Sequence, residues 1–247
     1  MIDVVYPLID ASKNRDDFEL KYSLRSLAVQ PWVNDVYIIG QHCPKWINTN
    51  IVKHIQCPDL YQGNKDGCII NKILRACCEQ SICENIVVNS DDQYFLKIVN
   101  PLIDLLPMKE YQITDNRYKV RNNGNNWHRR VCDTIHFCQL NKLPDFVLQS
   151  HTPYLINKHL YQKEMCRVPW GKGNGFTTHI YFNLLGNDVP VEPQGRTARI
   201  KNQFPLNRIK NLVSKAMFLN HNDGGLGPGM IEFLRQNFPN PSMWEKQ

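Results

Sequence analysis

Long apolar runs are absent from this sequence of 247 residues. None approaches the roughly 18 residues that a membrane-spanning helix needs, so we expect no membrane span. The opening MIDVVYPLID carries two aspartates and no basic residue, which predicts that there is no secretory signal peptide. WGKGNGF (170–176) lacks the spacing of a P-loop, GGLGPG (224–229) is not followed by a βαβ unit, and no G-x-S-x-G occurs. These absences argue against ATPases, hydrolases and oxidoreductases.

The cysteines form no recognisable framework. There are nine, an odd number, with no C-x-x-C pair, and Cys77 is adjacent to Cys78. This spacing suits neither a disulfide scaffold nor a zinc site. We therefore expect free thiols and a cytoplasmic protein, or one of the host cytoplasm if it is viral.

What is present is a chain able to bury a sizeable core, with 42% hydrophobic and 21% charged residues. Its first 95 residues alternate between apolar β-branched runs and amphipathic stretches. The pattern predicts strands at 2–9, 36–39, 52–55 and 86–88, and helices at 16–29 and within 64–83. This order indicates an α/β fold with a mostly parallel central sheet flanked by helices. Later in the chain we expect helices at 132–140, 153–161 and 230–237, a strand at 216–219 and a long loop at 117–130.

The clearest chemical signal follows the predicted strand at 86–88. There the sequence Asn-Ser-Asp-Asp places Asp91 and Asp92 at the end of a strand, where parallel sheets bind ligands. Adjacent carboxylates are suitable ligands for Mn²⁺ or Mg²⁺ bridging a diphosphate. A second cluster, Asn-His-Asn-Asp, offers His221 or Asp223 as a further ligand. A solvated turn or helix cap at the first cluster, and an Asn-Asp-Gly turn at the second, remain open alternatives.

Basic residues interleaved with aromatic ones are the third signal. The net charge is +6, and the expected loop at 117–130 is rich in arginine. Such a loop suits phosphates and bases, so we predict contact with nucleic acid, double-stranded DNA included. A solvated surface, or arginines that hold only a diphosphate, are the alternatives. The candidate residues are Arg117, Lys119, Arg121, Trp127, Arg129 and Arg130.

Four segments carry a family resemblance. The first comprises IDVVYPLID, FELKYSLRSL, VNDVYIIG and CPKWIN, and the second is INKILRACCEQSICENIVVNSDDQYF. The third is SHTPYLINKHLY, and the fourth comprises LNHND and FLRQNFPNPSMWE. In this order, over nearly the whole chain, they resemble the Stealth family of sugar-phosphate transferases. One departure is Asp10-Ala11-Ser12, where the family usually has an aspartate-glycine turn.

The resemblance implies a glycosyltransferase-A-like fold and a nucleotide-sugar donor. It implies one domain, 1–247, with a donor-binding half at 1–100 and an acceptor-side half at 101–247 that ends in a closing segment. On this hypothesis Asp10, Arg25 and Asp91 bind the donor, and Asp91 and Asp92 hold the metal with His221 or Asp223. The third motif implies that His151 is the catalytic base, acting together with Asp92.

The sequence thus predicts a metal-dependent glycosyltransferase that moves a sugar to an acceptor hydroxyl. The acceptor slightly preferred is a hydroxymethylated base in DNA, which the basic aromatic loops and the expected absence of a signal peptide favour. Phage DNA-modifying glycosyltransferases are of similar size and charge, an analogy of class and not of motif. The main alternative is a Stealth-type transfer of sugar 1-phosphate to a cell-surface glycan. A non-catalytic nucleic-acid-binding module is a second alternative, which would need the basic loops but not the paired aspartates.

Overall fold

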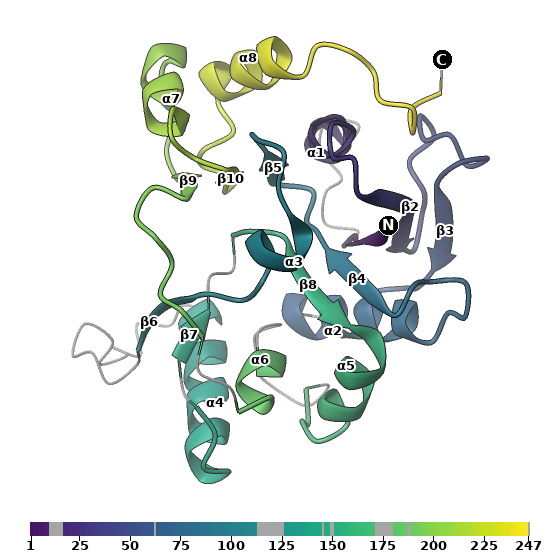
Figure 1. Cartoon of the computed structure of the whole chain (residues 1–247), viewed down its shortest axis with the longest axis vertical. Helices are drawn as coiled ribbons and strands as arrows, with labels where there is room; N and C mark the ends of the chain where they lie inside the picture. The colour runs from purple at the N-terminus through teal and green to yellow at the C-terminus, as the bar shows by residue number, and fades with distance from the viewer. Residues whose placement is uncertain are drawn as a thin grey trace.

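The computed structural model describes residues 1–9, 17–61, 63–112, 126–144, 146–148, 151–170, 180–186 and 189–246. Its largest sheet has the strand order β3-β2-β1-β4-β8 (Figure 1). The pairings β1 with β2, β1 with β4 and β2 with β3 are parallel, and β8 runs antiparallel to β4. The predicted α/β fold with a mostly parallel sheet is therefore confirmed. The strands are β1 (Ile2–Pro7), β2 (Val33–Gly40), β3 (Lys53–Gln56), β4 (Asn85–Val88) and β8 (Tyr154–Asn157).

Helices cover both faces of this sheet, and β1 is therefore buried along its whole length. Successive side chains of a strand point to opposite faces. Val4 accordingly shares a core with Leu20 and Leu24 of α1 (Phe18–Leu27). Val5 shares the other core with Ile70 of α2 (Lys65–Cys77).

A second sheet has the order β5-β10-β9. It consists of β5 (Gln93–Phe95), β10 (Phe218–His221) and β9 (Thr197–Ile200), with β10 antiparallel to β5 and parallel to β9. Helices α7 (Leu206–Val213) and α8 (Pro228–Asn237) pack on one of its faces (Figure 1). Because β5 follows β4 after a short turn at 89–92, the two sheets meet at this turn.

The remaining elements lie in the middle of the chain. They are α3 (Pro101–Asp104), β6 (Lys109–Gln112), α4 (Asn126–Leu140), β7 (Phe146–Leu148), α5 (Lys158–Met165) and α6 (Ile180–Leu184). Strands β6 and β7 form an antiparallel pair.

Three expectations from the sequence differ from the structure. The segment 153–161, expected to be a helix, is strand β8 followed by α5, with Tyr154 and Ile156 in the core. The loop expected at 117–130 ends sooner, since α4 begins at Asn126, and 113–125 lie outside the described residues. The strand expected at 216–219 occupies Phe218–His221. The predicted helix at 132–140 is the main part of α4.

The division into two halves at residue 100 stays a prediction. Strand β8, from the second half, pairs with β4, from the first. All nine cysteines are free thiols. Within the described ranges, no helix is both long enough and apolar enough to cross a membrane.

The segment after α8 runs past α1 toward β2 and β3 (Figure 1). There Ile47 and Glu245 form an antiparallel bridge, and the N–H of Asn48 donates to the carbonyl of Trp244 at 2.8 Å. The Trp244 side chain is buried in the same core as α1. The C-terminal segment is therefore a packed part of the fold.

Candidate active site

The turn at 89–92 is fixed by a buried hydrogen-bond network. The Asn89 amide donates to the Tyr6 hydroxyl at 2.9 Å, and its oxygen accepts from the N–H of Ser90 at 3.0 Å. The Ser23 hydroxyl lies 3.1 Å from that of Tyr6 and donates to the carbonyl of Gln93 at 2.7 Å. Asn89, Ser23 and Tyr6 are fully buried. A network with these partners satisfied holds the following aspartates in one orientation.

The carboxylates presented by this turn are crowded. Asp91 and Asp92 are adjacent, and Glu19 in the first turn of α1 adds a third negative charge near Asp92. Burial and the negative charges of Asp91 and Glu19 together raise the pKa of Asp92 to about 7, against opposing contributions from Lys65 and Asn220. Carboxylates that disfavour each other's ionised form in this way are stabilised by a cation.

His221 lies beside the carboxylates on β10 and is 1% exposed. Its Nδ1 is 3.1 Å from the carbonyl oxygen of Asn222, an acceptor only, so Nδ1 carries the proton. Its Nε2 is then unprotonated and accepts from the Tyr94 hydroxyl at 2.9 Å, with a Glu19 oxygen at 3.6 Å. Burial lowers the pKa of His221, which keeps the ring in the neutral form that a metal requires.

The donor set fits a hard divalent cation. Asp91 and Asp92 supply oxygen ligands, and Nε2 of His221 could become a ligand if it gave up its hydrogen bond from the Tyr94 hydroxyl. Over the described residues, no three His, Cys, Asp or Glu side chains are already arranged as a metal site. Two carboxylates are nevertheless enough where the phosphate oxygens of a substrate complete the coordination. Asp223, the alternative ligand, is exposed, and its role stays a prediction.

Asn220 connects the acids to the predicted base. Its Nδ2 donates to the carbonyl of Asp92 at 3.1 Å, and its side chain also hydrogen-bonds the Asp92 carboxylate. The same side chain hydrogen-bonds His151, which immediately precedes the β8 region. Burial and the positive charges of Arg199 and Lys201 together lower the pKa of His151 to about 4, against opposing contributions from Glu192 and Asn220. Asn220 thus links His151 to Asp92, and the catalytic roles of both stay predictions.

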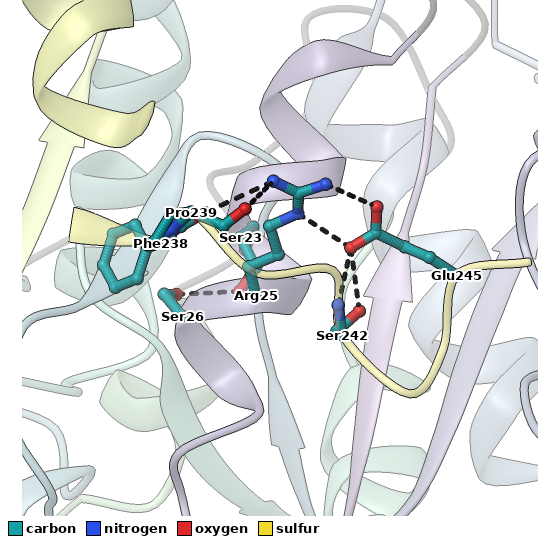
Figure 2. Close-up of polar contacts among 7 residues, drawn as sticks. All are labelled: Ser23, Arg25, Ser26, Phe238, Pro239, Ser242 and Glu245. Carbon is teal, nitrogen blue, oxygen red and sulfur yellow. Dashed lines mark hydrogen bonds and ion pairs between the residues drawn. The ribbon is translucent and has the colours of Figure 1, made fainter. Parts of the chain in front are cut away.

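Arg25, predicted to bind the donor, is instead engaged by the C-terminal segment (Figure 2). Its Nε and Nη2 each donate to a carboxylate oxygen of Glu245 at 2.8 Å. Its Nη1 donates to the carbonyl of Phe238 at 3.3 Å. The donor-binding role stays a prediction, and these contacts favour a structural role for the guanidinium.

Most of the predicted nucleic-acid contacts, and Asp10, fall outside the described residues. This holds for Arg117, Lys119 and Arg121, and for the side chains of Trp127 and Arg129 in the first turn of α4. Arg130 is described, and its Nε lies 2.5 Å from an oxygen of Asp66 at the start of α2. Both side chains are largely buried. Arg130 therefore anchors α4 on α2, and its role with nucleic acid stays a prediction that this geometry disfavours.

Sequence reasoning missed three members of this cluster. Glu19 and Tyr94 meet His221 only because α1, β5 and β10 converge in the fold. Asn220 was visible as the first residue of the Asn-His-Asn-Asp cluster, but its position opposite Asp92 depends on the pairing of β10 with β5.

Comparisons with known proteins show which solved structures share this fold. No family model and no curated protein matches the sequence. Among solved structures, the galactosyltransferase LgtC in complex with donor and acceptor sugar analogs is similar, with a TM-score of 0.54 and 8% identity over 98% of each chain. WbbM, a bifunctional glycosyltransferase, matches 98% of this chain and 50% of its own, with a TM-score of 0.56 and 12% identity.

The chain has a glycosyltransferase-A-like fold. At such low identity the likeness establishes the fold alone, and the expected architecture is confirmed. The more specific resemblance to the Stealth family stays a prediction.

Proposed function

We propose that this protein is a glycosyltransferase that moves a sugar from a nucleotide-diphosphate sugar to an acceptor hydroxyl. The observation that supports this most is the group of crowded acids, Asp91, Asp92 and Glu19, held by a buried network where the two sheets meet. Open α/β sheets bind ligands at the carboxyl ends of their strands, and Asp91 and Asp92 follow β4 directly.

The proposal includes Mn²⁺ or Mg²⁺ bound by Asp91 and Asp92, with His221 or Asp223. When bound, such an ion neutralises the diphosphate that leaves with the nucleotide. The protein's own contribution is orientation. Asn220 hydrogen-bonds both the backbone carbonyl and the carboxylate of Asp92, and the Tyr94 hydroxyl orients the ring of His221. Asp10 remains a proposed donor contact.

His151 is the proposed base for the acceptor proton. It is tied through Asn220 to the acid cluster, so an acceptor hydroxyl at His151 would lie close to the donor. With a pKa of about 4 it is neutral over the whole physiological range and able to accept a proton, although its basicity is low.

For the acceptor we now favour a glycan over DNA. The LgtC structure was determined with an acceptor sugar analog, whereas Arg130 of the basic region is held by Asp66. Transfer of the sugar alone is preferred to transfer of sugar 1-phosphate. The two differ in product, since the first releases a nucleoside diphosphate and the second a monophosphate.

A donor screen tests the proposal. The wild-type protein is mixed with nucleotide sugars, with Mn²⁺ or with EDTA, and unfolding is followed by thermal shift. A ligand at a hundredfold excess over its Kd adds about 2.7 kcal/mol to the free energy of unfolding, or roughly 5 to 10 °C. We expect one nucleotide class to stabilise the protein only with Mn²⁺. Chromatography of that nucleotide after turnover then distinguishes the two transfers.

Glu232→Gln provides a matched control, because Glu232 is an exposed acid on α8. It should behave like the wild type, whereas Asp92→Asn should lose the Mn²⁺-dependent shift. Stabilisation by every nucleotide sugar equally in EDTA would contradict the proposed metal-dependent function.

A further inference from the structure

The acid cluster has a basic counterpart across Asn220. The register of the second sheet places Gln93, Asn220 and Arg199 side by side on neighbouring strands. Paired residues of adjacent strands point to the same face, so the Arg199 side chain lies on the face where Asn220 contacts Asp92 and His151. Lys201 follows two positions later, just after β9, and is exposed.

Around β9, positive charges outnumber negative ones among the described residues, since Arg196, Arg199 and Lys201 lie near a single acid, Glu192. Glu192 is shared between Arg199, whose Nη2 is 3.2 Å from one carboxylate oxygen, and Arg196, whose Nη1 is 3.9 Å from the other. The Thr197 hydroxyl also donates to Glu192 at 2.5 Å. Lys201 has no ion pair within the described part of the chain. The Arg199 side chain as a whole is 20% exposed.

The site therefore has two electrostatic halves. Asp91, Asp92 and Glu19 lie on one side of Asn220, and Arg199 and Lys201 lie on the other, with His151 at the boundary. The acid half suits a cation and the diphosphate it carries. The basic half suits a second anion, which the acids would repel and the positive charges of Arg199 and Lys201 would attract.

We propose that Arg199 and Lys201 form an acceptor subsite that binds a negatively charged group, a phosphate or a carboxylate, beside the hydroxyl that receives the sugar. This inference rests on the proposed function and specifies its acceptor as an acidic glycan. An anion between the two cations also offsets the positive charge that acts on His151, so His151 becomes a stronger base when such an acceptor binds.

The test uses inorganic phosphate as the probe. The ring protons of His151 are assigned in an NMR spectrum by comparison with His151→Gln, and phosphate is titrated into wild-type protein. We expect saturable shifts of the His151 signals. Arg199→Gln/Lys201→Gln should weaken phosphate binding at least about tenfold, as the loss of charge-assisted hydrogen bonds implies. Lys201→Gln alone, a change at an exposed side chain, should weaken it less but measurably.

A charge-matched control separates a local site from general positive charge. Lys210→Gln/Arg235→Gln removes two exposed cations from α7 and α8 and should leave the phosphate titration unchanged. Equal binding by Arg199→Gln/Lys201→Gln and the control, or no shift of His151 in the wild type, would overturn the proposal.

Two further arms identify the occupant. Phosphate should still bind when the nucleoside diphosphate chosen in the donor screen is saturating with Mn²⁺. Displacement would assign the cations to the donor diphosphate and overturn the acceptor subsite. Glucuronate should shift the His151 signals at concentrations where glucose does not. If no nucleotide binds at all but phosphate and glucuronate still depend on Arg199 and Lys201, the proposed function fails while the anion subsite stands.

Discussion

Arg25 and Glu245, 220 positions apart in the chain, form a two-point ion pair that fastens the C-terminal segment to α1 (Figure 2). Both guanidinium–carboxylate contacts measure 2.8 Å. The Glu245 carboxylate also accepts a hydrogen bond from the backbone N–H of Ser242, at 2.7 Å. The first and fourth Stealth-like segments therefore meet in space through this pair.

Breaking that pair should destabilise the protein. The Arg25 and Glu245 side chains are only 12% and 6% exposed, and removing one partner of a buried pair costs about 3 kcal/mol. Glu245→Gln should lower Tm by roughly 6 to 12 °C for a chain of this size. Calorimetry at neutral pH measures it. A change in Tm of less than about 2 °C corresponds to less than about 1 kcal/mol. Such a result would mean that the C-terminal segment is not energetically coupled to α1.

The same pair predicts a pH dependence. The Arg25 hydrogen bonds hold the pKa of Glu245 below its ordinary value of 4.5, in spite of burial, which raises it. Because the folded-state pKa is lowered, the stabilisation is present above pH 4.5 and is lost as the pH falls through the folded-state value. The difference in stability between wild type and Glu245→Gln should therefore shrink below about pH 4.5.

Asp92→Asn should abolish activity without weakening the fold. The pKa of Asp92 is raised from 3.8 to about 7, so ionised Asp92 destabilises the metal-free protein as the pH rises between these values. Removing the charge should leave Tm at pH 8 unchanged or higher, while Mn²⁺-dependent turnover disappears. Differential scanning calorimetry and a donor-turnover assay measure the two effects. Retained turnover would show that Asp92 is not a ligand.

The sequence located these aspartates because a local pattern determined their place. An apolar run followed by polar residues marks a strand end, and Ile2–Pro7 and Asn85–Val88 are such runs. Tyr154–Asn157 was harder, since four residues show no period that separates a strand from a helix. Only pairing with β4 decides it.

The rest of the site depends on contacts between distant segments. Tyr94 and His221 are 127 positions apart, and no local pattern in either segment predicts that they hydrogen-bond. Arg25 was assigned to the donor on the family hypothesis, but its partner lies in the C-terminal segment. In both cases the tertiary fold determined the partner.

Asn220→Ala should reduce turnover more than donor affinity. Asn220 is 4% exposed and orients Asp92 and His151 without being placed against the donor. Loss of a residue that orients ligands typically costs roughly 10- to 100-fold in activity or metal affinity. We expect kcat to fall by that range and donor KM to change little. Asn207→Ala, at an exposed position on α7, is the control, and an equal effect of both variants would contradict the positioning role.

His151 should leave a distinct mark on the pH–rate profile. Its pKa of about 4 in the free protein predicts that kcat/KM, measured with saturating Mn²⁺, has no limb near 6.5 that depends on His151. The profile of kcat reports the complex with substrates, and an anionic acceptor should move the His151 limb upward there. His151→Gln should remove that limb. A kcat/KM limb near 6.5 that His151→Gln removes would contradict the assigned environment.

Arg130 is unsuitable for testing the DNA alternative, because it also stabilises the fold. Its ion pair with Asp66 is largely buried, and burial raises the pKa of Asp66, so Arg130→Ala leaves a carboxylate that is costly to keep ionised. Arg130→Ala should lower the free energy of unfolding by about 3 kcal/mol, and Asp66→Ala/Arg130→Ala should recover part of that loss. Urea unfolding of Asp66→Ala, Arg130→Ala and the double variant measures the coupling, and additive effects would mean that the pair is not coupled.

Arg129→Ala is therefore the variant for DNA binding, because any loss of affinity in Arg130→Ala would be mixed with unfolding. If duplex DNA is the acceptor, fluorescence anisotropy should show binding that falls steeply with salt. Arg129→Ala should then reduce the slope of log K against log salt by about one phosphate contact. Undetectable binding of a labelled duplex by the wild type at about 50 mM salt, where phosphate contacts are strong, would exclude DNA. The acidic glycan predicted from Arg199 and Lys201 would then be the remaining acceptor.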